Sequence, residues 1–332
     1  MDDAFLTELG LEKGSRKLIG SEERSAVLSR LDGESYKCNA GGSLSNTLVA
    51  LSRLGAAAGA AAPVGLAGSV GGDALGDFYR SKMRRAGVAF ASDPLPDGTT
   101  GTVIVLTTPD AQRTMLSYLG TSAELRCDGA LRAAAGSTQV LVVEGYLLEQ
   151  EDTVAAICAA VGEARRAGAL VALTCADVGV VRAHGPAFRA VLAAGVDVLF
   201  SNAAEAGQLA GCAEAPAAAQ VLAQAGGAGL AVVTDGSRGA YLATRAGAFV
   251  HALPHWAEEA PVDTCGAGDA YAAGVLHSLL NGATLRHAGA FGSRVASAVI
   301  SRRGARLAEE EAATLVLAFQ ELALDAALQC DD

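Results

Sequence analysis

Short apolar runs alternate with longer helical patterns through the middle of the chain. The apolar runs are Val140 to Val143, Leu170 to Thr174, Val196 to Phe200 and Leu230 to Thr234, and helical segments between them include Asp152 to Ala167 and Ala203 to Ala210. Runs that are apolar on both faces are typical of parallel strands covered by helices on both sides. The alternation therefore predicts a three-layer α/β/α fold around a mostly parallel central sheet.

The pattern changes at the C-terminal end and around residue 100. Helices are expected over Ala267 to Leu280, Leu285 to Ser301 and Ala308 to Leu328. Thr99 to Thr108 has the pattern of a strand, Pro109-Asp110 that of a turn, and Arg113 to Tyr118 that of a returning strand. We interpret this hairpin as a small β lid outside the main sheet.

Composition narrows the possible partners. The 332 residues carry 36 Asp+Glu against 25 Lys+Arg, a formal net charge of −11. This charge repels nucleic acid, and no stretch of about 18 uninterrupted apolar residues predicts a membrane span. Because no Pro/Ser-rich linker divides the chain, we expect one continuous domain over residues 1–332.

The cysteines and the first residues bear on location. The seven cysteines are odd in number and never spaced C-x-x-C, which favours free thiols in a reducing compartment. Met1-Asp2-Asp3 lacks the features of a signal or transit peptide. We expect a cytoplasmic protein, or an organellar one if a targeting segment precedes Met1, and a monomer or a homodimer.

The strongest local motif is Asp263-Thr264-Cys265-Gly266-Ala267-Gly268-Asp269, followed by an apolar helix. The backbone amides of Gly266, Ala267 and Gly268 at a helix start can form an anion hole, which the helix dipole reinforces. Asp269 would lie beside it, where it could accept a proton from an attacking hydroxyl. The alternative is a tight turn with Asp269 as a capping residue. Walker, Rossmann, zincin and serine hydrolase motifs are absent from the sequence.

This motif resembles the second signature of the ribokinase/PfkB family of sugar and nucleoside kinases, and Gly41-Gly42-Ser43-Leu44-Ser45-Asn46-Thr47 resembles the first. A Gly-Gly pair permits close approach of a polyol, and an Asn one turn later can donate and accept hydrogen bonds. The resemblance implies substrate contacts for Gly41, Gly42 and Asn46. Alternatively, the two glycines simply open a helix.

Two further segments bear on the substrate. The run from Thr108 to Met115 is similar to the lid of the adenosine-kinase-like branch. Glu144 follows an apolar strand, and a carboxylate at the carboxyl edge of a parallel sheet can bind sugar hydroxyls. The resemblance implies a substrate contact for Glu144, whereas a solvated strand end is the alternative.

Three elements resemble the family's nucleotide side. Asn202-Ala203-Ala204-Glu205 matches the Asn-x-x-Glu element, which implies that Asn202 and Glu205 face Mg²⁺ and ATP phosphates, although Asn202 could be a plain N-cap. Thr234, Gly236 and Gly239 match a nucleotide loop, or alternatively a hairpin turn. Ala296, in the small-residue stretch Gly292 to Ala298, would line the adenine wall or serve helix packing.

The resemblance implies an ATP-dependent phosphotransferase that acts on a hydroxymethyl group of a sugar or nucleoside, adenosine-like or fructose- or ribose-like, with Mg²⁺. Lid segments would lie at about residues 1–40 and 97–120. The family's first strand, which carries a substrate-binding Asp, has no counterpart before Phe5. This difference leaves a second hypothesis open: a catalytically weak kinase-like subunit that serves as a protein-interaction module.

Overall fold

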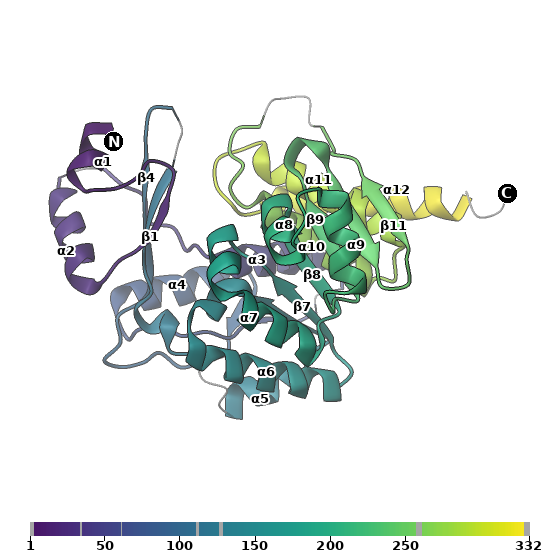
Figure 1. Ribbon diagram of the computed structural model, residues 1–332, viewed down its shortest axis with the longest axis horizontal. Helices are drawn as coiled ribbons and strands as arrows, with labels where there is room; N and C mark the ends of the chain where they lie inside the picture. The colour runs from purple at the N-terminus through teal and green to yellow at the C-terminus, as the bar shows by residue number, and fades with distance from the viewer. Residues whose placement is uncertain are drawn as a thin grey trace. The chain divides into compact units, whose positions relative to one another are not determined.

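The computed structural model describes residues 3–33, 35–60, 62–110, 113–125, 129–256 and 261–328. The chain forms two compact units (Figure 1). Unit 1 comprises Met1–Ala40, Gly68–Lys82 and Ser92–Leu125, and unit 2 comprises Gly41–Ala67, Met83–Ala91 and Arg126–Asp332. Both expected lid segments lie within unit 1, while a single domain over residues 1–332 stays a prediction.

Unit 1 is built around a small sheet. Its elements are α1 (Asp3–Glu8), β1 (Arg16–Leu18), α2 (Ser21–Arg30), β4 (Thr102–Thr107) and β5 (Arg113–Tyr118), and α4 (Ala74–Arg85) begins in unit 1 and ends in unit 2. β5 is central, parallel to β1 and antiparallel to β4. The expected hairpin is therefore confirmed, although Ala111 and Gln112 of its turn lie outside the described residues.

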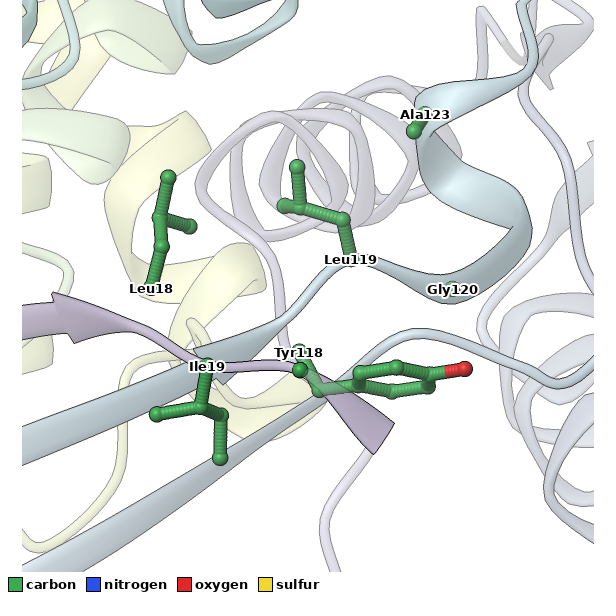
Figure 2. A pocket seen from close by; sticks show the side chains of 7 residues that line it. Leu18, Ile19, Tyr118, Leu119, Gly120 and Ala123 are labelled. Carbon is green, nitrogen blue, oxygen red and sulfur yellow. The ribbon is translucent and has the colours of Figure 1, made fainter. Parts of the chain in front are cut away.

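Apolar side chains on one face of this sheet pack against the two N-terminal helices. The small core consists of Leu6, Ile19, Val27, Leu106 and Leu116. At the ends of β1 and β5 lies an open hollow of about 500 Å³ (Figure 2). Figure 2 shows Leu18 and Leu119 pointing to one side and Ile19 to the other. None of the site residues predicted from the sequence lines this hollow, and we assign it no function.

Unit 2 contains the larger sheet. Its helices are α3 (Ser43–Ala57), α5 (Gly129–Ala135), α6 (Glu151–Arg166), α7 (Val178–Gly195), α8 (Ala203–Ala210), α9 (Ala215–Gln224), α10 (Ala267–Leu280), α11 (Leu285–Ile300) and α12 (Glu309–Leu328). Its strands are β2 (Val64–Leu66), β3 (Val88–Phe90), β6 (Val140–Glu144), β7 (Leu170–Thr174), β8 (Val198–Asn202), β9 (Leu230–Thr234), β10 (Ala240–Thr244) and β11 (Phe249–Ala252).

Six of these strands form the central sheet in the order β11-β10-β9-β8-β7-β6. The pairs β6–β7, β7–β8 and β8–β9 are parallel, and β10 is antiparallel to both of its neighbours. The short strands β2 and β3 form a separate parallel pair. Within the described residues β6 is an edge strand of the larger sheet, and the missing first strand stays a prediction.

Helices cover both faces of the sheet, as the apolar runs predict. On one face, Tyr271, Val275 and Leu276 of α10 and Ala288 of α11 share a buried cluster with Val232 of β9 and its neighbours. On the other face, α6, α8 and α9 pack against the strands (Figure 1). This is the expected three-layer α/β/α architecture. No described helix is long and apolar enough to cross a membrane.

Two elements, β8 and α7, differ from what the sequence pattern predicts. β8 runs from Val198 to Asn202 rather than from Val196 to Phe200, because Asp197 pairs with Val171 where the strand enters the sheet. The pattern does not predict α7, whose helical period is broken by glycines and by Pro186. The structure accommodates that proline with a kink at His184, where φ is −119°.

Candidate functional site

Several candidate residues lie at the carboxyl edge of the parallel strands of unit 2. Glu144, Asn202 and Thr234 are the last residues of β6, β8 and β9. Asn202 and Thr234 are register neighbours across the β8–β9 pair. This edge of an open α/β sheet is where ligands usually bind, because loops and helix N-termini converge there. The fold thus places residues that are up to 90 positions apart in the sequence at one edge.

The Gly-Ala-Gly-Asp motif forms the start of α10. Gly266 is the N-cap and has a φ of 78°, and a Cβ added there would lie 2.3 Å from the carbonyl oxygen of Ala305. Glycine is therefore required at this position by both backbone conformation and space. The Ala267 amide donates to the Thr264 carbonyl at 3.3 Å, so it is not an open donor as the sequence suggested.

Other amides at this helix start are open. In the described part of the chain, the backbone N–H groups of Gly268 and Asp269 have no hydrogen-bond partner, and the first helical bond runs from Ala270 to Gly266 at 2.9 Å. Unpaired N–H groups at a helix N-terminus, together with the helix dipole, bind anions. The open amides of this motif therefore belong to the first turn of α10, and their role as an anion hole stays a prediction.

The Asp269 carboxylate is held by two side chains of α3. Ser43 donates from Oγ to Oδ1 at 2.5 Å, and Asn46 donates from Nδ2 to Oδ2 at 2.9 Å. Thr47 adds a bond from its hydroxyl to the Asp269 carbonyl at 3.2 Å. Burial raises the pKa of Asp269, while the bonds from Ser43 and Asn46 oppose that shift. A carboxylate with a raised pKa is a better proton acceptor than a solvated one.

Glu144 also contacts the N-terminus of α3. The Leu44 amide donates to Glu144 Oε1 at 3.2 Å, and Gly42, the N-cap of α3, has a φ of 106°. Burial raises the pKa of Glu144 to about 7; the bond from Leu44 opposes this rise and the Asp269 carboxylate adds to it. The structure thus brings Gly42, Asn46, Glu144 and Asp269 together around the first turns of α3 and α10. Gly41 lies directly before this turn, and its carbonyl accepts a bond from Ser45 Oγ at 2.8 Å.

Asn202 and Glu205 form a capping box at the start of α8. The Glu205 amide donates to Asn202 Oδ1 at 2.9 Å, and the Asn202 amide donates to Glu205 Oε2 at 2.9 Å. Asn202 Nδ2 also donates to Glu205 Oε1 at 2.7 Å. The N-cap interpretation of Asn202 is therefore confirmed, and any further role would be additional to it.

The Glu205 carboxyl is buried. Only 6% of the residue is exposed, and burial raises its pKa to about 7, with the Asn202 bond opposing and Asp177 reinforcing the shift. Among the residues that the structure describes, no group of three or more His, Cys, Asp or Glu could hold a metal ion. The residues fit a cation that takes most of its ligands from water or phosphate, which is the usual state of Mg²⁺.

The loop from Thr234 to Gly239 is the turn between antiparallel β9 and β10. Gly236 and Gly239 have positive φ values of 55° and 90°, and a Cβ on Gly239 would lie 2.2 Å from the Ala252 carbonyl. Thr234 donates from its hydroxyl to the Ser201 carbonyl at 3.4 Å. The hairpin-turn interpretation is thus confirmed for the backbone, and the loop lies next to Asn202.

Ala296 is placed differently from the other candidates. It is partly buried on α11 and packs against the core cluster beneath the sheet. Nearby, a Cβ on Gly274 would lie 2.8 Å from the Gly292 Cα, so small residues let α10 and α11 approach closely. The small-residue stretch therefore serves helix packing, and the place of Ala296 beside adenine stays a prediction.

Sequence reasoning missed partners of the central carboxylate. Ser43 and Thr47 contact Asp269 although they are 226 and 222 residues away in the sequence, and Arg306 contacts Asn46 across 260 residues. The only local signal was the position of Ser43 and Thr47 inside the Gly-Gly motif. For Arg306 the sequence offers no signal, because its role depends on how the segment after α11 returns to α3.

Comparisons with known proteins identify the family of this chain. The pattern of the pfkB family carbohydrate kinase matches residues 15–312. A nucleoside kinase of Methanothermobacter thermautotrophicus is 28% identical over 267 residues, which are 80% of this chain and 79% of that protein.

Solved structures are similar over nearly the whole chain. An adenosine kinase from Sinorhizobium meliloti is 30% identical with a TM-score of 0.83, covering 96% of this chain and 94% of that one. A probable sugar kinase from Rhizobium etli is 27% identical with a TM-score of 0.84, covering 98% and 94%. The family match over residues 15–312 spans both segments that surround Asp269.

Proposed function

This chain belongs to the pfkB family of carbohydrate kinases and is an ATP-dependent kinase of a sugar or nucleoside. On that premise we propose that it phosphorylates a hydroxymethyl group of a nucleoside, with Asp269 as the general base. One observation carries the assignment. The Asp269 carboxylate is fixed by Ser43 and Asn46 beside two open amides of the first turn of α10. A proton acceptor next to an anion hole is the arrangement that phosphoryl transfer to an alcohol requires.

In the proposed step, one phosphorus–oxygen bond forms while another breaks. The acceptor hydroxyl oxygen forms a bond to the γ-phosphorus of ATP while the bond from that phosphorus to the β–γ bridging oxygen breaks, and ADP leaves with the electron pair. The hydroxyl proton goes to the Asp269 carboxylate, whose two oxygens each accept one bond and retain a second lone pair. The amides of Gly268 and Asp269 face the charge that develops on the transferred group.

The remaining candidates divide between the two substrates. The substrate that accepts the phosphoryl group would lie beside Gly41, Gly42, Asn46 and Glu144. The ionised Glu144 carboxylate accepts a hydrogen bond from a sugar hydroxyl. The ATP phosphates would lie at the ends of β8 and β9, beside Asn202, Glu205, Thr234, Gly236 and Gly239. The adenine ring of ATP would lie beside Ala296. Asn202 and Glu205 would hold Mg²⁺ through water, and the bound ion would offset the phosphate charge.

Two features support a nucleoside acceptor over a free sugar. The relatives described as nucleoside and adenosine kinases are 28% and 30% identical to this chain. The hairpin sequence from Thr108 to Met115 is similar to the adenosine-kinase-like branch. The probable sugar kinase at 27% identity keeps a free ribose- or fructose-like sugar as the second candidate.

Replacing Asp269 with Asn tests the proposed base. The Asp269→Asn variant should lose turnover by about 10³-fold, because removal of a general base costs about that much, while ATP binding measured by calorimetry stays nearly unchanged. The matched control is Asp152→Asn, which changes an exposed carboxylate at the start of α6 and should keep full activity. Normal turnover of the Asp269→Asn variant would contradict the assignment. ATP binding by the unmodified protein without turnover of any acceptor would instead favour the interaction-module hypothesis.

A further inference from the structure

Arg306, in the segment between α11 and α12, reaches the start of α3. Its Nε donates to Asn46 Oδ1 at 3.4 Å, and its Nη2 donates to Ser45 Oγ at 3.3 Å. The same Asn46 amide donates from Nδ2 to Asp269 Oδ2 at 2.9 Å. These bonds form one continuous chain from the guanidinium to the central carboxylate. We propose that Arg306 is a positioning residue for Asp269 and acts through the Asn46 amide; this inference rests on the proposed function.

The chemistry of the two ends fixes the direction of the chain. A guanidinium has only donors, and an ionised carboxylate has only acceptors. An amide that lies between them must therefore turn its oxygen toward Arg306 and its NH₂ toward Asp269. Asn46 is only 8% exposed, so solvent does not supply the Oδ1 atom with an equivalent donor. Arg306 thereby selects one of the two amide orientations.

The backbone on both sides of Arg306 is held to the site. The Gly304 amide donates to Asp263 Oδ2 at 3.0 Å, and Ala305 packs directly against Gly266. The guanidinium of Arg53 on α3 donates to the Leu307 carbonyl. The segment that carries Arg306 is thus attached to both the α10 loop and α3. These contacts fix the backbone position from which the Arg306 side chain extends.

The orientation of Asn46 affects the proton acceptor directly. If the amide flipped, its oxygen would face Asp269 Oδ2, and a favourable bond to the carboxylate would become a repulsive contact. The bond from Asn46 lowers the pKa of Asp269 against the effect of burial. Loss of that bond would therefore raise the pKa of Asp269 and leave the carboxylate free to rotate.

The test compares Arg306→Met with Arg303→Met. Methionine has no donor, and Arg303 is an exposed arginine of the same loop, so the second variant is a matched control. Arg306→Met should lower kcat by about tenfold or more with little change in the KM for ATP. The base must be ionised, so the acid limb of the kcat profile should move to higher pH, by about one unit. Arg306→Lys, which keeps a donor and a charge, should recover part of kcat. Arg303→Met should behave as the unmodified protein.

Measuring Arg306→Met with and without Asn46 distinguishes a positioning role of Arg306 from a general effect on the stability of the protein. In an Asn46→Ala background, Arg306→Met should cause no further loss of kcat, since the intermediary is gone. An equal loss in both backgrounds, or an unmoved acid limb in Arg306→Met, overturns the proposal. If Arg306→Met does not fold, Arg306→Lys is compared in the two backgrounds by the same criterion.

Asp269→Asn separates the two proposals. If Asp269→Asn loses turnover and Arg306→Met does not, the assignment of Asp269 as the base stands and the positioning role of Arg306 is contradicted. Retained turnover in Asp269→Asn contradicts the base itself.

Discussion

Buried carboxyl groups are the residues on which this site depends. Glu144 and Glu205 have pKa values raised to about 7, and the pKa of Asp269 is also raised, chiefly by burial in each case. Buried acids without a cation destabilise a fold in their ionised form. Buried carboxyl groups with raised pKa values are typical of sites that bind or react.

Glu144 gives a pH prediction with a definite sign. Its folded pKa of about 7 lies above the ordinary value of 4.5, so the folded state binds more protons than the unfolded state between these values. Its effect on stability is therefore unfavourable as pH rises through this window. Glu144→Gln, which keeps the acceptor for Leu44, should melt a few degrees above the unmodified protein at pH 8 and show little difference at pH 4.5. Calorimetric scans at the two pH values measure this.

The same residue should control acceptor binding. In the unmodified enzyme the KM for the acceptor should fall as pH rises through about 7, because the ionised carboxylate accepts hydroxyl bonds more strongly. In Glu144→Gln this dependence should be absent. A KM profile that is identical in the two proteins would contradict substrate contact by Glu144.

At the residue scale, the sequence predicted the groups that belong to local motifs. Asp269, Glu144 and the Asn202–Glu205 pair follow from short spacings next to a predicted strand or helix. Ser43 and Arg306 do not, because their contacts with Asp269 and Asn46 arise only when α3, α10 and the segment after α11 meet. Non-local packing of this kind leaves no periodic trace in the chain.

Among the elements, the start of α10 is the one whose geometry is most restrictive. Gly266 combines a φ of 78° with a Cβ position 2.3 Å from the Ala305 carbonyl, whereas Gly268 has nothing within 4 Å of its Cβ position. Gly268 therefore has space for a side chain, whereas Gly266, two residues earlier, does not. This contrast provides a matched pair of variants.

Gly266→Ala should destabilise the protein by about 1–3 kcal/mol, because it places a side chain in a left-handed conformation and against backbone. Gly268→Ala should fold with nearly unchanged stability. Chemical denaturation of both variants measures the difference. Equal stability of the two would show that the α10 loop does not depend on the close approach of Ala305.

Prediction of elements succeeded where the hydrophobic pattern was regular. β7, β9, α8 and α10 have the bounds expected from the sequence. The kinked helix α7 was not predicted, since Pro186 interrupts its period. β8 was misplaced by two residues, because the pairing of Asp197 with Val171 is a tertiary contact. The strand order of the sheet likewise came only from the structure.

For the whole molecule, the net charge of −11 constrains how ATP is bound. General attraction cannot hold a polyphosphate on an acidic protein, so binding must be local. The N-terminus of α10 offers open amides, and we propose that the buried Glu205 carboxyl at the start of α8 binds the cation that accompanies the phosphates.

The most direct test is product formation with defined acceptors. The protein is incubated with ATP, Mg²⁺ and, in separate reactions, adenosine, other nucleosides, ribose and fructose, and ADP release and the phosphorylated product are measured together. We expect equimolar ADP and nucleoside 5′-monophosphate from the unmodified protein, and neither product from the Asp269→Asn variant. ADP release without a phosphorylated acceptor, or full activity in Asp269→Asn, would contradict it.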